Sequence, residues 1–448
     1  MWPQGPGLSR VTYARTVGSC VTLPQGRVGE PVGKDIPEAD PRRIARFLRE
    51  AGEVGKDPRG GWSRLAFSQE ERQAHALFER WAAGLGMTVR TDAIGNTFAE
   101  LGGNDGSRSA LMSGSHLDTV PQGGGFDGSA GVAAALEVAR LLLEAGGTSR
   151  PYRAVVFSGE EGARFGAPCI GSRIATGDFT SATLQELSDR EGHSVAESAE
   201  GLGLRPSDVA EAVWSRGAVE AFMELHIEQG RVLESRGVPL GVVDAIAGST
   251  RAELSFSGHA DHSGATPMPL RSDALVGASE FVVEVERRAA AYPTTVATVG
   301  RIEVDPGSFT TVPGLARLAL DVRDVDSERQ RELLEELLDQ GMRIAARRNL
   351  ELSAVLVSDQ SPVVLHKPIR ERLAKAALER GVPFRVLPSG ATHDSAHVAR
   401  IAPTGLVFVP SREGLSHTPE EWSRVEDIAR GAEVMAAALL ALDEEETG

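Results

Sequence analysis

The spacing of apolar residues predicts helices over 41–48 and 68–81, where apolar side chains return to the same helical face turn after turn. The second of these helices has a clear start signal. Ser68 precedes Glu71 by the spacing of a capping box, in which each side chain bonds the other residue's backbone N–H. We therefore expect two helices before the first strand of the main sheet.

Short apolar runs come next and predict buried strands. Residues 109–114 form the first run and residues 154–158 the second, while the apolar stretch 131–146 between them, closed by glycines, predicts a helix. A strand, a loop, a helix and a strand in this order predict a layered α/β domain. In such domains ligands bind beyond the carboxyl ends of the strands.

After about residue 245 the pattern changes to alternating strand-like segments combined with long amphipathic helices. A β-α-β-β-α order over about a hundred residues is enough for a small α+β domain. We predict an irregular N-terminal arm over 1–35, a discontinuous α/β domain over 36–245 and 359–448, and an inserted α+β domain over 246–358. The segments that predict the inserted domain are 251–257, 272–291, 294–304, 317–322 and 327–348.

Length and charge narrow the classes of function. At 448 residues the chain is too long for one ordinary core, which agrees with two domains. The net charge of −16 argues against a nucleic-acid partner, because phosphate backbones are bound by basic faces. An anionic substrate would have to be attracted by local positive groups, such as metal ions or a placed arginine.

The two cysteines, Cys20 and Cys169, cannot form a disulfide framework, so a reducing, cytoplasmic setting is expected. No apolar run reaches the roughly 18 residues of a membrane helix, and no membrane partner is expected. Basic residues prevail over 1–34, as in a transit peptide, but glycines and prolines interrupt this segment and it has no apolar core. A loose arm is the favoured interpretation.

Candidate metal ligands lie directly after the strand-like runs. They are His116, Asp118 and Asp127 after the first run, Glu160 and Glu161 after the second, His226 between Glu224 and Glu228, and His417 near the C-terminus. Each alone is a weak signal, since a lone histidine is usually structural and adjacent glutamates are usually solvated. An α/β layout would bring them to one sheet edge, where burying so many carboxylates without a cation is costly. Two divalent ions resolve that cost, and imidazole with carboxylate suits Zn, Mn, Ni or Co.

A glycine-rich stretch offers a competing interpretation. Gly123-Gly-Gly-Phe-Asp-Gly128 fits the dinucleotide pattern G-x-G-x-x-G between a strand and a helix. A nucleotide site is disfavoured, because Asp127 would lie inside the phosphate cradle and repel the pyrophosphate. His116 and Asp118 would also be left without a role.

From about Gly60 to Trp422 the chain resembles the hydantoinase/carbamoylase branch of the M20-type peptidases. That branch includes N-carbamoyl-L-amino acid hydrolases, β-ureidopropionases, allantoate amidohydrolases and ureidoglycolate amidohydrolases. The motifs that carry the resemblance are Gly-Gly-Trp-Ser-Arg-Leu-Ala-Phe-Ser over 60–68, Asp-Ala-Ile-Gly-Asn over 92–96, Glu-Glu-Gly-Ala-Arg-Phe-Gly over 160–166, Gly-Ser-Arg over 171–173, Glu-Leu-His-Ile-Glu-Gln-Gly over 224–230, His-Ala-Asp-His-Ser-Gly-Ala-Thr-Pro-Met over 259–268, Ser-Gly-Ala-Thr-His-Asp over 389–394 and Leu-Ser-His over 415–417.

The resemblance implies a role for each candidate. Asp127 would bridge two ions, with His116 and His226 completing one and Glu161 and His417 the other. Asp118 would orient the His116 imidazole, and Glu160 would be the general base that takes a proton from water and passes it to the leaving nitrogen.

The resemblance also implies that the inserted domain pairs two subunits of a homodimer and acts as a lid. His262 would reach the partner's active site and stabilise the oxyanion, and Arg323 would grip the substrate carboxylate. Without the resemblance, an arginine among Asp321, Asp324 and Asp326 would be interpreted as a surface ion pair. Gln229 and His393 would complete the pocket.

Three residues depart from the branch's usual pattern. Thr310 stands where an asparagine usually supports the substrate, Asp261 replaces an asparagine before His262, and Thr392 replaces a glycine before His393. None removes a metal ligand, and all three affect the substrate side of the pocket.

The expected function is metal-dependent hydrolysis of an N-carbamoyl-L-amino acid to the amino acid, carbon dioxide and ammonia. The nearest alternative is a ureide of purine catabolism, allantoate or ureidoglycolate. An M20 dipeptidase or aminoacylase, and a catalytically silent binding protein on the same fold, are less favoured.

Overall fold

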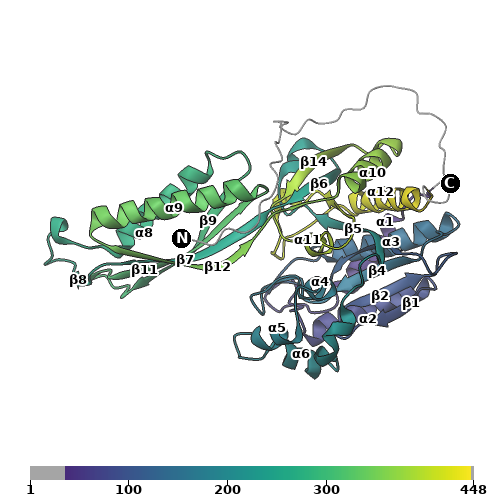
Figure 1. Cartoon of the computed structure of the whole chain (residues 1–448), viewed down its shortest axis with the longest axis horizontal. Helices are drawn as coiled ribbons and strands as arrows, with labels where there is room; N and C mark the ends of the chain where they lie inside the picture. Colours follow the sequence, from purple (N-terminus) through teal and green to yellow (C-terminus); the bar gives the residue numbers. More distant parts are fainter. Residues whose placement is uncertain (1–35, 445–448) are drawn as a thin grey trace.

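The computed structural model describes residues 36–444, and the predicted arm over 1–35 lies outside them. The described chain forms two bodies, each built on its own sheet (Figure 1). The larger sheet has nine strands and the smaller has four. This is the layered α/β class that the sequence predicts. Over 36–444 no helix is both long enough and apolar enough to cross a membrane.

The nine-stranded sheet carries the candidate ligands. Its strands, in spatial order, are β1 (Thr88–Thr91), β2 (Thr97–Leu101), β4 (Tyr152–Phe157), β3 (Ala110–His116), β5 (Val219–Ile227), β15 (Thr404–Val409), β6 (Leu240–Ile246) and β13 (Val363–Val364), with β14 (Phe384–Ser389) also paired to β6. The central strands β4, β3, β5 and β15 run parallel to their neighbours in that order. Their carboxyl ends therefore share one edge of the sheet.

Helices cover both faces of this sheet. The main core lies on one face, where the sheet packs against α1 (Pro41–Ala51), α2 (Gln69–Gly84), α3 (Ser129–Glu144), α10 (Lys367–Glu379) and α12 (Val425–Glu444). A smaller core on the other face includes residues of α4 (Ile170–Ala175) and α11 (Asp394–Val398). The short helices α5 (Ser181–Glu186), α6 (Val195–Gly201) and α7 (Val232–Arg236) lie in the connections.

The four-stranded sheet is antiparallel and forms the smaller body. Its order is β12 (Glu351–Gln360), β7 (Gly248–Ser257), β11 (Leu315–Asp324) and β9 (Val296–Asp305). Two helices, α8 (Ala274–Ala289) and α9 (Ser327–Arg348), pack on it around a separate core that includes Phe256 and Phe281. In the chain this body lies between β6 and β13, which both belong to the larger sheet.

Two local expectations need correction. Strand β12 was not predicted, because none of its ten residues is buried and its sequence therefore lacks an alternating pattern. The capping box at α2 is only half formed. Ser68 Oγ accepts from Glu71 N at 3.2 Å, but the Glu71 carboxylate accepts from the backbone N–H groups of Phe67 (2.6 Å) and Gly159 (2.8 Å) instead. Glu71 thus ties the start of α2 to the loop that carries Glu160.

Candidate metal centre

Parallel strands deliver the candidate ligands to one place. His116 is the last residue of β3, His226 lies one residue before the end of β5, and Glu160 follows the end of β4 by three residues. Asp127 immediately precedes Gly128, the residue before α3, and His417 lies in the loop after β15. The candidate ligands therefore lie at the edge of the sheet where these parallel strands end.

Five of the predicted residues form two groups that share Asp127. In the first group, Nε2 of His116 and Nε2 of His226 lie 3.4 and 3.1 Å from Asp127 Oδ1. In the second group, His417 Nε2 lies 3.6 Å from Asp127 Oδ2 and 3.4 Å from Glu161 Oε1. Within each group the potential ligand atoms all lie within 4.8 Å of one another. One carboxylate oxygen of Asp127 thus faces each group.

The donor set fits divalent cations. His116 Nε2 is buried and has no hydrogen-bond partner, so its lone pair is available to a metal. The side chains of Asp127, Glu160 and Glu161 are buried beside it, where like charges repel each other unless a cation offsets them. Imidazole and carboxylate in groups of three are the ligands of catalytic zinc and related ions, with positions left open for water or substrate.

Asp118 joins the two loops that carry these ligands. Its Oδ1 lies 3.4 Å from His116 Nδ1 and accepts from Glu160 N at 3.0 Å, while its Oδ2 accepts from Glu161 N at 2.9 Å. His116 Nδ1 also lies 3.1 Å from the backbone oxygen of Asp118, so Asp118 holds the imidazole through two groups while its fully buried carboxylate places both glutamates.

Glu160 stands beside the first group without being part of it. Its Oε2 lies 3.7 Å from His116 Nε2, and its Oε1 accepts a hydrogen bond from Cys169 Sγ at 3.3 Å. Burial raises the pKa of Glu160 to about 7, with the carboxylates of Asp118 and Asp127 adding to the effect. A carboxyl group with a pKa near neutrality exchanges protons readily at neutral pH.

The other ionisable groups confirm how negative this pocket is. Burial, followed by repulsion from Asp127 and Glu160, raises the pKa of Glu161 well above its usual range. Burial alone would lower the pKa of His226, yet the Asp127 carboxylate raises it to about 9. The bare ligand set therefore favours any positive charge, whether a proton or a metal ion.

The glycine-rich stretch serves close packing around Asp127. A Cβ at Gly128, where φ is +62°, would lie 2.5 Å from the His116 ring, and a Cβ at Gly124 would lie 2.1 Å from the Glu421 carboxyl carbon. Gly125 faces the ring of Trp62, which would lie 3.2 Å from such a Cβ. The pattern that resembled a dinucleotide motif thus has a structural use at the metal centre.

Glu421 was missed by the sequence analysis and links both groups. Its Oε1 accepts from Phe126 N and Asp127 N, both at 2.8 Å, and its Oε2 accepts from His417 N at 3.3 Å. His417 has a left-handed backbone with φ of +61°, which costs about 1 kcal/mol or more and persists only where its surroundings hold it. A glutamate four residues after a histidine gives no sequence signal of this role.

Arg64 was also missed, and it hydrogen-bonds to the two loops that carry His116 and Asp127. It is 1 % exposed, and its guanidinium donates to Leu117 O at 2.7 Å and to Ser129 Oγ at 3.2 Å. Leu117 lies between His116 and Asp118, and Ser129 begins α3 just after Asp127. Arg64 belongs to the 60–68 motif, which gave the only sequence signal for it.

The metal centre opens into a cavity of about 340 Å³ with a positive wall. Arg323 and Arg251 line it together with the candidate ligands, and they lie on the neighbouring strands β11 and β7. Arg323 donates to Asp321 Oδ2 (2.9 and 3.1 Å) and to Gly390 O (2.8 Å), while Arg251 Nε lies 3.8 Å from the same Asp321 oxygen. Two guanidinium groups share one carboxylate, so this wall keeps a net positive charge despite the chain's overall −16.

The other predicted pocket residues differ in their placement. Gln229 lines the cavity and donates from Nε2 to Asp127 Oδ2 at 2.7 Å, and Thr392 also lines it. His393 does not. It is buried against the His226 ring, with centroids 4.5 Å apart, and its Nε2 pairs with Ser389 Oγ at 2.8 Å. Burial lowers the pKa of His393 well below its usual value.

His262 and Thr310 lie apart from this metal centre. They meet at the two-stranded pair β8 (Asp261–His262) and β10 (Thr311–Val312), at the end of the smaller body farthest from the large sheet (Figure 1). Ser263 N donates to Thr310 O at 2.9 Å there, and Asp261 Oδ2 lies 3.1 Å from His259 Nδ1. Within one subunit, therefore, neither His262 nor Thr310 reaches the candidate ligands.

Comparison with known families gives one match over most of the chain. Residues 112–441 match the model of peptidase family M20/M25/M40. This stretch includes all five candidate ligands.

Individual relatives match at nearly full length. The chain is 40 % identical to N-carbamoyl-L-amino acid amidohydrolase of Geobacillus stearothermophilus, over 88 % of this chain and 96 % of that protein. It is 34 % identical to ureidoglycolate hydrolase of Oryza sativa subsp. japonica, over 89 % of this chain and 84 % of that protein. A hydantoinase/carbamoylase family amidase from Burkholderia multivorans superposes with a TM-score of 0.84 at 34 % identity, over 91 % of this chain and 99 % of that one.

Proposed function

The chain is an amidohydrolase of peptidase family M20/M25/M40, and we propose that it hydrolyses the ureido group of an N-carbamoyl-L-amino acid. Hydrolysis of a ureido C–N bond is the reaction class that its named relatives support. One water and one substrate molecule give the free amino acid, carbon dioxide and ammonia.

The sharing of Asp127 by two ligand groups carries the proposal. His116, Asp127 and His226 would hold one divalent ion, and Asp127, Glu161 and His417 would hold a second. We propose Zn, Mn, Co or Ni, the ions that suit imidazole and carboxylate ligands. Such ions polarise a carbonyl oxygen and lower the pKa of a nearby water molecule.

Glu160 is proposed to move the proton. Its carboxylate lies beside the first ligand group without a place in either, and Cys169 and the backbone contact with Asp118 hold it there. It accepts the proton of the attacking water and delivers that proton to the leaving nitrogen, which then departs as a neutral amine or ammonia. The adjacent Glu161 stays a ligand, so the two neighbouring carboxylates divide the work.

Arg323 and Gln229 are proposed to orient the substrate. Arg323, with Arg251 beside it, gives the cavity a positive wall at which a substrate carboxylate binds. Gln229 donates to Asp127, and its Oε1 has no hydrogen-bond partner, so it can accept from a ureido N–H. A substrate held by its carboxylate then presents its ureido carbon to the ligand groups.

A second subunit is proposed to complete the site through His262. His262 Nδ1 accepts from Gly264 N and Ala265 N at 3.1 and 3.2 Å, so the ring proton resides on Nε2 and can be donated to an oxyanion. Large apolar side chains are exposed near this tip, Phe309 at 106 %, Met268 at 73 % and Leu270 at 72 %. Such exposure favours burial against a partner, which we propose is a second copy of the chain.

Subunit complementation tests this arrangement. His262→Ala and Glu160→Gln should each abolish turnover in the homodimer. A heterodimer of the two variants has one site with an intact Glu160 and the partner's intact His262, so it should recover about half of the wild-type activity. Silent heterodimers would place His262 in its own subunit's site, and an active His262→Ala homodimer would place His262 outside catalysis.

Ammonia release measured on the metal-loaded protein tests the function itself. N-carbamoyl-L-amino acids should be turned over in preference to allantoate, ureidoglycolate and dipeptides. Ureidoglycolate or allantoate is the second candidate, because a relative at 34 % identity is a ureidoglycolate hydrolase. Preference for a dipeptide, or no turnover of any of these compounds with two bound ions, would refute the proposal.

A further inference from the structure

A large groove lies next to the metal centre and the proposed reaction leaves it unused. It has a volume of about 780 Å³ and shares Gln229, Ala391 and His417 with the cavity at the metal centre. Ligand pockets are usually about 300–1,000 Å³, so the 340 Å³ cavity alone has room for a carboxylate and a ureido group. The groove is additional space that is continuous with the reaction site.

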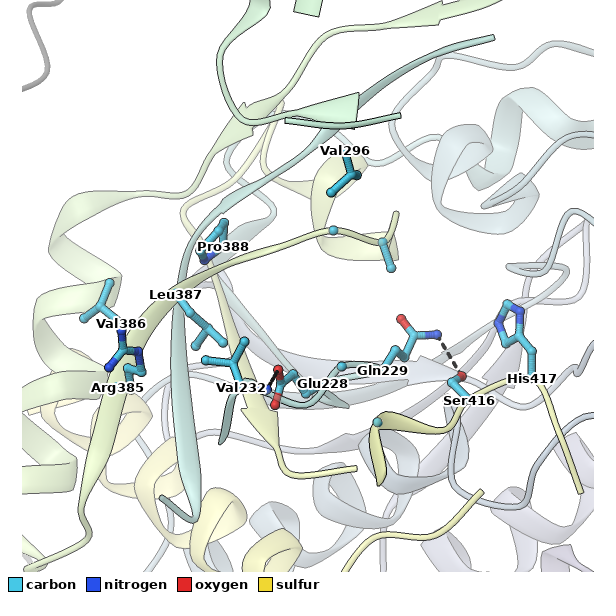
Figure 2. Close-up of a pocket in the computed structure, with 14 residues that line it drawn as sticks. Glu228, Gln229, Val232, Val296, Arg385, Val386, Leu387, Pro388, Ser416 and His417 are labelled. Carbon is cyan, nitrogen blue, oxygen red and sulfur yellow. Dashed lines mark hydrogen bonds between the residues drawn. The ribbon is translucent and has the colours of Figure 1, made fainter. Parts of the chain in front are cut away.

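Its walls are apolar, and they come from both bodies of the chain. Val232 of α7, Val386 of β14 and Val296 of β9 line it, and they are 43, 37 and 56 % exposed. Figure 2 shows Val386 beside Arg385 at one end of the groove. Leu387 and Pro388 add to the same surface. Three part-exposed valines from separate elements thus line one groove, and apolar side chains gathered in a groove mark a binding surface more often than scattered single residues do.

The polar groups along the groove do not compete for a ligand in its middle. The Glu228 carboxylate is already occupied, accepting from Val232 N at 2.7 Å and Leu233 N at 2.8 Å. Gln229, Ser416 and His417 lie at the end that meets the metal centre, and Arg385 lies at the opposite end (Figure 2). Between these ends the lining side chains are apolar and offer no hydrogen bond in place of those that a polar ligand group gives up to water on the covered side.

We infer that this groove, defined by Val232, Val296, Val386, Leu387 and Pro388, receives the side chain of the substrate and selects N-carbamoyl amino acids with large apolar side chains. The inference rests on the proposed function and decides between its two candidate substrate classes. Ureidoglycolate and allantoate are polar throughout and have no group to place against these valines. A leucine, methionine or phenylalanine side chain packs against the apolar side chains of the groove while the carboxylate stays at Arg323.

The expected preference follows from the buried surface. Moving one methylene group from water to an apolar site favours binding by about fourfold. Leucine carries four more carbon atoms than glycine, and a groove open to solvent covers about half of them. The kcat/KM for N-carbamoyl-L-leucine should therefore exceed that for N-carbamoylglycine by roughly fifteenfold. As product inhibitors, L-leucine and glycine should differ in the same direction.

The test compares this leucine-to-glycine ratio in the metal-loaded protein and its variants. Val386→Asp places a charge in the groove and should reduce the ratio to less than about threefold. Val296→Ser, from the smaller body, should reduce it in the same direction. Val364→Asp is the matched control, because Val364 is a 53 % exposed valine on β13 outside the groove. It should keep the wild-type ratio.

The outcomes separate the groove from the proposed function. Equal kcat/KM for the glycine and leucine derivatives would refute the inference that the groove binds the side chain, and so would a ratio unchanged by Val386→Asp and Val296→Ser. The proposal of ureido hydrolysis would still stand in either case. Failure to hydrolyse any N-carbamoyl amino acid, with turnover of allantoate or ureidoglycolate, would overturn both.

Discussion

Replacing Glu421 with glutamine tests how the two ligand groups are held together. The carboxylate accepts from Phe126 N, Asp127 N and His417 N, and so it connects the loop before α3 to the loop after β15. A glutamine carbonyl oxygen can keep the two 2.8 Å bonds, but its NH₂ group then faces His417 N–H. The His417 N–H thus loses its acceptor and faces another N–H donor instead.

The cost can be estimated from these contacts. A buried backbone N–H left without an acceptor costs about 1–3 kcal/mol, so Glu421→Gln should lower the free energy of unfolding by about 1–2 kcal/mol. Glu421→Ala leaves all three donors without a protein acceptor and should cost at least about 3 kcal/mol. The glutamine variant also releases His417 from its left-handed backbone. Affinity for the ion between Asp127, Glu161 and His417 should then fall about 10–100-fold, as when partners that orient metal ligands are removed.

The measurements are urea unfolding in chelator and metal binding by equilibrium dialysis. Both belong at pH 8.5 or above, because burial, with repulsion from Asp127, raises the pKa of Glu421 to about 7. At limiting free metal the glutamine variant should hold one tightly bound ion per subunit where the wild type holds two. Glu420→Gln is the control, since Glu420 is exposed and makes the same change of charge one residue away. Two ions bound with wild-type affinity in Glu421→Gln would refute the positioning role.

Four further predictions concern other parts of the molecule. Glu160→Gln should keep both ions and the wild-type unfolding free energy but lower kcat by about a thousandfold or more, and a variant with substantial turnover would remove Glu160 as the base. Arg323→Ala should raise KM at least about tenfold for carboxylate substrates without changing metal content, whereas the exposed Arg317→Ala on the same strand should leave KM unchanged. Chelation should lower the free energy of unfolding, by about 4 kcal/mol for each ion present at 1,000 times its Kd, and an unchanged melting temperature would refute metal binding to the folded state. Burial lowers the pKa of His397 from its ordinary value of 6.5 to about 4, so the unfolded chain binds a proton below pH 6.5 that the folded chain refuses. The resulting loss of about 3 kcal/mol between pH 6.5 and pH 4 should be absent in His397→Leu, as measured by urea unfolding across that range.

The sequence predicted the convergence of ligands because that property follows from topology. His116, Glu160 and His226 lie at or just after the ends of parallel strands, and neighbouring parallel strands end at one edge. Asp127 and His417 are brought there by loops. Their placement made them candidate ligands, and the resemblance assigned each ligand to one of two ions. The two groups in the structure contain the same five residues.

The supporting contacts could not be predicted in the same way. Glu421, Arg64 and Arg251 act through backbone groups or shared partners that only the folded chain brings near. Arg64 stands in the 60–68 motif, but the motif does not indicate these contacts, and Glu421 and Arg251 have no distinctive spacing around them. The capping box failed for a related reason. The Ser68–Glu71 spacing describes a local bond, but a buried Glu71 gains more from joining two backbone N–H groups, one of them at Gly159 beside the catalytic loop.

The site has a negative side, formed by the carboxylates of the large sheet, and a positive side, formed by two arginines of the smaller body. Asp118, Asp127, Glu160 and Glu161 concentrate negative charge at the sheet edge, which cations stabilise and which alone would repel an anionic substrate. Arg251 and Arg323 belong to the other body and share the single carboxylate of Asp321, so under the proposed function they would attract the substrate's carboxylate to their wall. A substrate held at that wall would present its ureido carbon to the ligand groups and its side chain to the groove that we propose for it. Three separate contacts are enough to fix the orientation of a chiral centre. The two-body architecture supplies them, because neither sheet alone carries the acidic ligand groups, the arginines and the apolar wall.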